Sequence, residues 1–179
     1  PDIGEPGGVL QAGEAVNVEQ RLAELGVTLP PVPAPVAAYV PAVRSGSMIY
    51  TSGQLPLHDG ELLHAGLVGS EVGLDDAVAC ARQCALNALA AVAEQAGGLD
   101  GVRIVKVVGF VASAPGFTAQ PQVVNGASGL IGEVLGEHGV HARSAVGVAA
   151  LPLNAPVEVE VIAEELPGLY RTILDRIAE

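Results

Sequence analysis

The sequence predicts an α+β fold, in which a single sheet is covered by two helices on one of its faces. Segments with the two-residue period of strands and segments with the period of helices follow one another in the order strand, strand, helix, strand, helix, strand, strand. Half of the 179 residues are apolar, but only 3% are aromatic. A chain of this length and composition is expected to form one domain around an aliphatic core.

The two ends of the chain differ from this domain in composition. Residues 1–16 are rich in Gly, Pro and Glu, so a disordered leader is expected there. Residues 18–25 have the spacing of a short amphipathic helix that ends at a glycine, and prolines between 30 and 35 favour an extended linker. Residues 167–179 form a tail with an amphipathic helical pattern, which leaves 17–166 as the domain.

Turn and cap residues bound the elements of the domain. Ser45-Gly46 separates two β-prone segments, and Pro115-Gly116 ends an apolar strand. The clearest helix has Asp75 and Asp76 in its first turn, where the helix dipole favours negative charge, and it ends before Gly97. The expected elements are strands at 36–44 and 47–52, a helix at 74–95, a strand at 102–113, a helix at 120–135, and strands at 142–151 and 157–165.

The formal net charge of -12 disfavours nucleic acid and membrane surfaces as partners. No basic stripe with interleaved aromatic residues appears, and no apolar run reaches the roughly 18 to 20 residues of a membrane helix. The start of the chain lacks the pattern of a secretory signal, so the cytoplasm is the default compartment. Cys80 and Cys84 are interpreted as core residues on one helix face rather than as a redox pair, and no metal site is predicted.

One arginine near the end of the chain stands out, because Arg143 lies in an apolar segment of a protein with only 8 Lys and Arg. A planar guanidinium can bind a carboxylate with two parallel hydrogen bonds, so Arg143 is a candidate site for a small organic acid. The structural alternative is an ion pair with a carboxylate of the protein itself, such as Glu165. Glu158, in the Val-Glu-Val-Glu run that follows, is a candidate for proton transfer or simply a half-solvated strand residue.

Strand alternation leads to an expectation about where these two side chains lie. In the last strand, Val157 and the next two alternate valines share one face, and Glu158 lies on the other. In the strand before it, Val146 and Val148 share one face and Arg143 lies on the other. If the valines of both strands meet the helices, Arg143 and Glu158 share the open face, which small apolar residues suggest is covered by other subunits.

A simple hairpin between these last two strands would set their register. Arg143 would then face Glu165, and Glu158 would face Ala150, which separates Arg143 from Glu158 by roughly 20 Å along the strands. One pocket that uses both would have to draw them from neighbouring subunits, unless a bulge or a different strand order intervenes.

Several short segments, in this order and at this spacing, resemble the reactive-intermediate deaminase family (Rid, also called YjgF), in its longer branch with an extra N-terminal helix. The segments are Arg21-Leu22-Ala23-Glu24-Leu25-Gly26, Tyr39-Val40-Pro41, Ser52-Gly53-Gln54-Leu55-Pro56, Ala81-Arg82-Gln83 with Asn87, Val123-Val124-Asn125-Gly126-Ala127-Ser128, Arg143-Ser144, Leu151-Pro152 and Val157-Glu158-Val159-Glu160. The resemblance implies a Rid-like domain with a chorismate-mutase-like fold, a homotrimer and three clefts between subunits.

The resemblance also implies an activity, the hydrolysis of 2-imino or enamine acids to 2-keto acids and ammonia without a metal or cofactor. Arg143 would bind the carboxylate of this small substrate, and Glu158 would position or activate the attacking water. The remaining residues that it places in the cleft are Tyr39, Ser52, Gly53, Asn125 and Ala145. Many members have Cys where this chain has Ala145, whose backbone carbonyl would remain to bind an amine, and many have Pro where this chain has His141.

Four of these residues have a structural alternative. Tyr39 can serve as packing material, Ser52-Gly53 can be a strand end or bulge, and Asn125 can cap a helix. Two functional alternatives also stay open. The same cleft could bind or sense a carboxylated metabolite without turnover, or the protein could be a ribonuclease, which the net charge of -12 disfavours.

Overall fold

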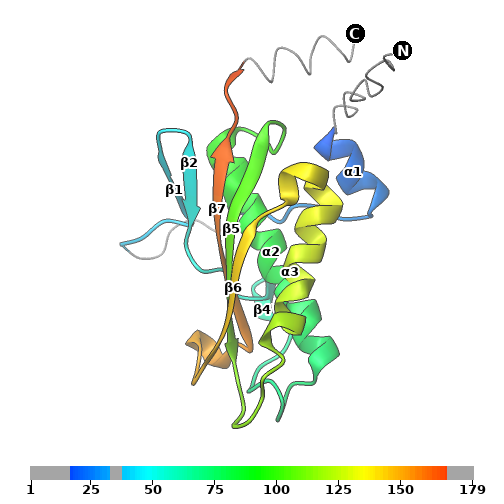
Figure 1. Ribbon diagram of the computed structural model, residues 1–179, viewed down its shortest axis with the longest axis vertical. Helices are drawn as coiled ribbons and strands as arrows, with labels where there is room; N and C mark the ends of the chain where they lie inside the picture. The colour runs from blue at the N-terminus through cyan, green and yellow to red at the C-terminus, as the bar shows by residue number, and fades with distance from the viewer. Residues whose placement is uncertain (1–16, 33–37, 169–179) are drawn as a thin grey trace, which may run out of the picture.

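The computed structural model describes residues 17–32 and 38–168. A five-stranded sheet with the strand order β1-β2-β7-β5-β6 forms one layer, and the two long helices α2 and α3 cover one of its faces (Figure 1). The elements are α1 (Val18–Glu24), β1 (Ala42–Ser45), β2 (Met48–Thr51), β3 (Leu57–His58), β4 (Glu61–Leu62), α2 (Leu74–Ala96), β5 (Val102–Ala112), α3 (Gln120–Leu135), β6 (Ala142–Val148) and β7 (Val157–Glu165), with single 3-10 turns at Gly136–Gly139 and Pro152–Asn154.

The predicted α+β class and the order of the main elements are confirmed. The bounds of α3 and β7 coincide with the predicted ones, and α2 differs by one residue at its end. The short hairpin of β3 and β4 was not predicted from the sequence. The predicted leader 1–16, part of the linker (33–37) and most of the tail (169–179) lie outside the described residues.

The strand order differs from the hairpin expected between the last two strands. β5 lies between β6 and β7, parallel to the first and antiparallel to the second. Arg143 therefore pairs with Val107 rather than Glu165, and Glu158 pairs with Phe110 rather than Ala150. The 3-10 turn between β6 and β7 and its flanking residues make a connection long enough to pass the end of β5, so consecutive strands need not be neighbours.

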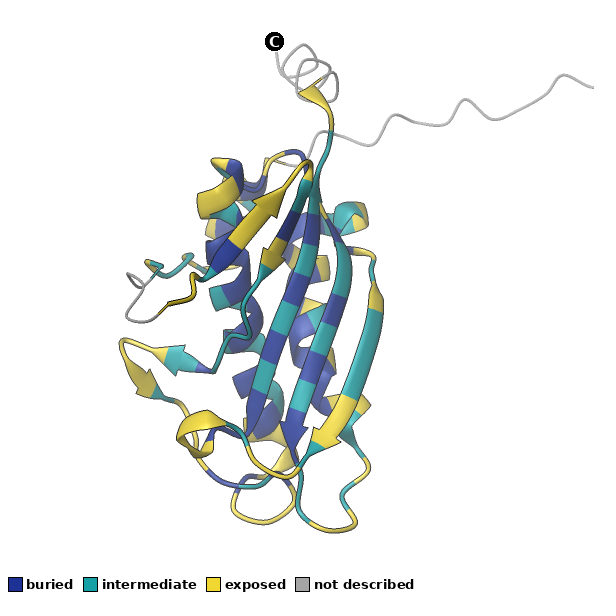
Figure 2. Ribbon diagram, turned by 90° about the vertical axis from the view of Figure 1, so that its left-hand side faces the viewer, coloured by how far each residue is buried: buried dark blue, intermediate teal, exposed yellow. Residues whose placement is uncertain are grey.

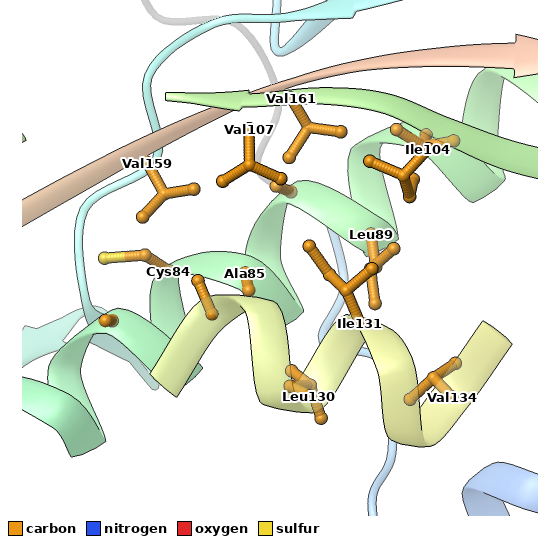
Figure 3. Close-up of a cluster of buried hydrophobic side chains, with 14 of the residues drawn as sticks. Cys84, Ala85, Leu89, Ile104, Val107, Leu130, Ile131, Val134, Val159 and Val161 are labelled. Atoms are coloured by element: carbon orange, nitrogen blue, oxygen red, sulfur yellow. The ribbon is translucent and has the colours of Figure 1, made fainter. Parts of the chain in front are cut away.

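The core is aliphatic, as expected, and lies between the sheet and the two helices. Figure 3 shows Val107, Val159 and Val161 of the sheet above Leu89 of α2 and Ile131 of α3, all at most 1% exposed. None of the described helices combines the length and the hydrophobicity that spanning a membrane requires.

The two cysteines belong to this core, as predicted. Both are fully buried, and the thiol of Cys84 donates a weak hydrogen bond to the carbonyl oxygen of Val157, at 3.6 Å. Burial, with a smaller contribution from Asp76, raises the pKa of Cys80 to about 11. Burial also raises the pKa of Cys84 well above its ordinary value. Both side chains are therefore protonated thiols that pack like small apolar residues.

The expectation that Arg143 and Glu158 share the open face is wrong. Val157 and the alternate residues of β7 do point to the helices, which leaves Glu158 on the open face. In β6, however, Arg143 lies beside the buried Val107 and therefore on the helix side, whereas Val146 points to the open face, where it is 45% exposed. β6 is an edge strand, so its valines are not required to face the core.

Candidate functional site

Glu158 lies on the open face of the sheet, toward its middle, since β7 has neighbours on both sides. Its carboxylate is half-buried and has no hydrogen-bond or ion-pair partner among the residues that the structure describes. Burial first, and then the negative charge of Glu160, raise the pKa of Glu158. A carboxyl group in this condition exchanges a proton more readily near neutral pH than an exposed one does.

Gly53 lies directly against this carboxylate. A Cβ atom built on Gly53 would overlap Oε1 of Glu158 and would lie 2.7 Å from Cδ and 2.9 Å from Cγ. Real Cβ atoms do not approach other atoms so closely, so only glycine permits the observed position of the Glu158 side chain. The predicted site residue Gly53 thus has a physical reason to be glycine.

Ser52 precedes Gly53 in the chain and is hydrogen-bonded to the segment that follows Tyr39. The hydroxyl of Ser52 donates to the carbonyl oxygen of Val40 at 2.7 Å, and its backbone N–H donates to Pro41 at 2.8 Å. These bonds hold the segment that contains Tyr39, which is 66% exposed, next to the end of β2. Tyr39 is therefore not buried packing material, and Ser52 acts as a link between two backbone segments. We name Tyr39, Ser52, Gly53 and Glu158 the glutamate half-site.

Arg143 extends from β6 to the side of α3. Its Nη1 donates to Oδ1 of Asn125 at 2.8 Å and to the hydroxyl of Ser128 at 3.2 Å, and its Nη2 donates to the carbonyl oxygen of Pro121 at 3.3 Å. All three acceptors are neutral. Nε–H and one of the two hydrogens on Nη2 have no acceptor among the described residues. Arg143 is held by its own chain, but its hydrogen-bonding capacity is not exhausted.

The structural alternative for Arg143, an ion pair with Glu165, is wrong. Glu165 pairs with Arg44. In the described part of the chain, each of three other arginines has a glutamate partner, whereas Arg143 has none. The three pairs are Arg44 with Glu165, Arg82 with Glu133 and Arg103 with Glu164. A half-buried guanidinium surrounded by neutral acceptors remains available for an external anion.

Asn125 contacts Arg143, and Ala145 lies near it on the same strand. Asn125 does not cap α3, which begins five residues earlier at Gln120, and its side chain instead binds the guanidinium. Ala145 follows Arg143 by two residues on the same face of β6 and packs at the edge of the core. We name Arg143, Asn125 and Ala145 the arginine half-site.

A single chain does not bring the two half-sites together. Val107 of β5 pairs with Arg143 on one side and with Val161 of β7 on the other, so Arg143 is level with Val161. Val161 is three residues from Glu158, which corresponds to roughly 10 Å along the strand. The two strands are second neighbours, roughly 10 Å apart, and the two side chains point to opposite faces of the sheet. The sheet itself therefore separates them.

Two further residues, Ser128 and His141, lie next to the arginine half-site and had no assigned partner in the sequence. Nε2 of His141 lies 2.9 Å from the hydroxyl of Ser128, which also accepts from Arg143. The three-residue spacing of Asn125 and Ser128 could have indicated that their side chains lie together, because residues three apart on a helix point to the same side.

Comparisons with known proteins agree with this fold. The family model described as endoribonuclease L-PSP matches residues 31–165. Protein TCP17 of Trypanosoma cruzi is 45% identical over 150 residues, which are 83% of this chain and 94% of that protein. The 2-iminobutanoate/2-iminopropanoate deaminase of Salmonella typhimurium is 35% identical over 133 residues, 73% of this chain and 90% of that enzyme.

A solved structure gives a similar result. The crystal structure of Atu1372 from Agrobacterium tumefaciens, a protein of unknown function, is 49% identical and superposes with a TM-score of 0.76, covering 83% of this chain and 92% of that one. The helix α1 precedes the segment that the family model matches. By the extent of that match and by these identities, the chain belongs to the YjgF/Rid family, whose model bears the description endoribonuclease L-PSP.

Proposed function

We propose that this protein hydrolyses small 2-imino or enamine acids to 2-keto acids and ammonia. The proposed cleft forms where the arginine half-site of one copy meets the glutamate half-site of another. The observation that supports this most is a pair of unmatched charges. Within the described residues, Arg143 has no carboxylate partner and Glu158 has no donor. An acid substrate would supply the carboxylate that Arg143 lacks, and a water molecule would supply the donor that Glu158 lacks.

The reaction requires an anchor and one proton relay. Arg143 would bind the substrate carboxylate, which brings the imine carbon to a fixed place. Glu158 would accept a proton from water as the water oxygen bonds to that carbon and the C=N electron pair moves to nitrogen. Starting from the protonated imine, this attack gives a hydroxyl and a neutral amine on the same carbon. Glu158 would then pass its proton to the amine nitrogen and accept the proton of the hydroxyl, as the C=O bond forms and ammonia leaves. The raised pKa of Glu158 suits both steps, because the group must accept and then return a proton.

The open face of the sheet supports the association of copies. Several apolar side chains lie on it, and Figure 2 shows this face with its exposed and partly buried strand residues. Val43, Tyr50 and Val146 are 52%, 40% and 45% exposed. Apolar side chains that are exposed across a sheet face favour an interaction there, and closed cyclic association would cover this face in every copy. We expect a homotrimer with three clefts, as the family resemblance implies.

The printed name of the Salmonella typhimurium relative, 2-iminobutanoate/2-iminopropanoate deaminase, favours the same substrate class. The decisive experiment generates imines in place with an amino-acid oxidase and follows the release of keto acid and ammonia. We expect Arg143→Ala and Glu158→Gln to lose most of the activity. Arg82→Ala, which breaks an ion pair with Glu133 between the two helices and away from the open face, serves as the matched control and should retain activity. Full activity of Arg143→Ala would refute the assignment.

A second candidate is a protein that binds or senses a carboxylated metabolite without turnover. It is favoured by the arginine half-site, because the donors that remain on Arg143 can bind a carboxylate without any contribution from Glu158. It predicts saturable binding by calorimetry that Arg143→Ala abolishes and Glu158→Gln leaves unchanged, with no acceleration of imine hydrolysis. The ribonuclease named in the family description is disfavoured by the net charge of -12, and RNA cleavage that survives repurification and is lost in Arg143→Ala would revive it.

A further inference from the structure

We infer that His141 and Ser128 are positioning residues, which orient the guanidinium of Arg143 so that one of its edges is left for a carboxylate. This inference rests on the proposed function and adds to it a hydrogen-bonded series of four groups. The series runs from the carbonyl oxygen of Gly139 through His141 and Ser128 to Arg143.

The first bond of the series determines the tautomer of the histidine. Nδ1 of His141 lies 2.5 Å from the carbonyl oxygen of Gly139. A carbonyl oxygen can only accept a hydrogen bond, so Nδ1 must bear the proton. In the neutral ring Nε2 is then an acceptor, and it receives the hydroxyl proton of Ser128 over 2.9 Å.

The orientation of the Ser128 hydroxyl follows from this. Because its hydrogen points to His141, its lone pairs are available to Nη1 of Arg143, at 3.2 Å. Without the histidine, the same hydroxyl could rotate and compete for other acceptors. Asn125 takes the second hydrogen of Nη1, so this end of the guanidinium is fully used.

The opposite edge of the guanidinium is formed by Nε and Nη2. It has three hydrogens, and Pro121 accepts only one of them, so two remain. When Pro121 accepts the Nη2 hydrogen that points away from Nε, Nε–H and the other Nη2–H are two parallel donors on a planar group, and they match the two oxygens of a carboxylate. The series therefore selects a planar carboxylate that binds at the Nε–Nη2 edge, and it should discriminate against the neutral amide of the same shape.

If Ser128 and His141 orient the guanidinium, replacing them should affect the binding of charged and neutral ligands differently. A purely structural role would affect both ligands equally. Ser128 is half-buried on α3, where alanine is well tolerated by a helix. A loss of packing would weaken all ligands alike and lower the melting temperature. A loss of guanidinium orientation should weaken the carboxylate far more than its amide.

The test measures binding of pyruvate, a simple 2-keto acid, and of pyruvamide, its neutral counterpart, to the full chain by titration calorimetry. We expect Ser128→Ala and His141→Ala each to raise the Kd for pyruvate by about tenfold, the typical effect of a hydrogen bond to a charged group. The double variant should be no weaker than Ser128→Ala, since both residues act through one series of bonds. Ser128→Thr, which keeps the hydroxyl, should bind as the unmodified protein does.

Matched controls exist in the same region of the fold. Ser113→Ala removes a hydroxyl that contacts the Val111 carbonyl and Gln120, and His138→Ala removes a neighbouring histidine outside the series. Both should leave the Kd unchanged. A Kd for pyruvate within twofold of the original in Ser128→Ala and His141→Ala, or an equal loss for pyruvamide, would overturn the inference. If Arg143→Ala also binds pyruvate normally, the proposed function itself fails; if only Arg143→Ala loses binding, the inference alone fails.

Discussion

Replacing Gly53 by alanine should move the Glu158 carboxylate without removing it. This variant therefore tests whether activity depends on where the carboxylate lies. The new Cβ would lie 2.7 Å from Cδ of Glu158 and overlap Oε1, whereas carbon atoms pack at roughly 3.5 to 4.0 Å. The carboxylate must therefore move by about 1 Å. The group that yields is the end of a flexible side chain, so the cost in folding should stay below about 1.5 kcal/mol, the range of an off-rotamer side chain.

The effect on catalysis should be much larger. A displacement of about 1 Å in a catalytic geometry can reduce the rate by about a hundredfold. We expect Gly53→Ala to lower kcat/KM for imine hydrolysis by this order with a nearly unchanged melting temperature, and to cause no further loss in a Glu158→Gln background. Gly132→Ala, at a helical glycine with open space around it, is the control. Normal activity of Gly53→Ala alongside an inactive Glu158→Gln would contradict the reasoning.

Three other predictions concern the charge, the packing and the assembly. Glu160 helps to raise the pKa of Glu158, and a base is active only when ionised, so Glu160→Gln should move the acidic fall of the pH–rate profile to lower pH. Gly126→Ala should lower the free energy of unfolding, measured in urea, by about 1 to 3 kcal/mol, because the new Cβ would overlap the backbone of α2. Gly129→Ala has open space around its new Cβ and should raise the same free energy by up to about 1 kcal/mol. Val146→Asp on the open face should reduce the molar mass measured by light scattering to that of one chain and abolish turnover, and an unchanged mass would argue against assembly through this face.

The elements of this fold were largely predictable because the chain marks their ends. Gly97 follows α2 in the left-handed conformation, with φ of 73°, and a proline lies in the first turn of α3. β7 was recognisable from the strict alternation of valine with glutamate, and its valines do face the core. Local patterns of this kind depend only on residues that are close in the sequence.

The strand order was not predictable in the same way. Alternation shows which residues of a strand share a face, but it does not show which strand lies beside it. The valines of β6 therefore led to a wrong prediction of the face on which Arg143 lies. An edge strand can expose Val146 while its small residues lie under α3. The contact of Arg143 with Asn125 and Ser128 joins residues 15 to 18 positions apart, and it became visible only when β6 and α3 were placed in space.

The sheet that stands between Arg143 and Glu158 has a consequence for mixtures of inactive proteins. If every active centre draws its two charged groups from different polypeptides, a chain without the guanidinium and a chain without the carboxylate can repair one another. Coexpression of Arg143→Ala with Glu158→Gln should then recover part of the turnover that neither variant has alone, and dilution of the unmodified protein should lower its activity per molecule.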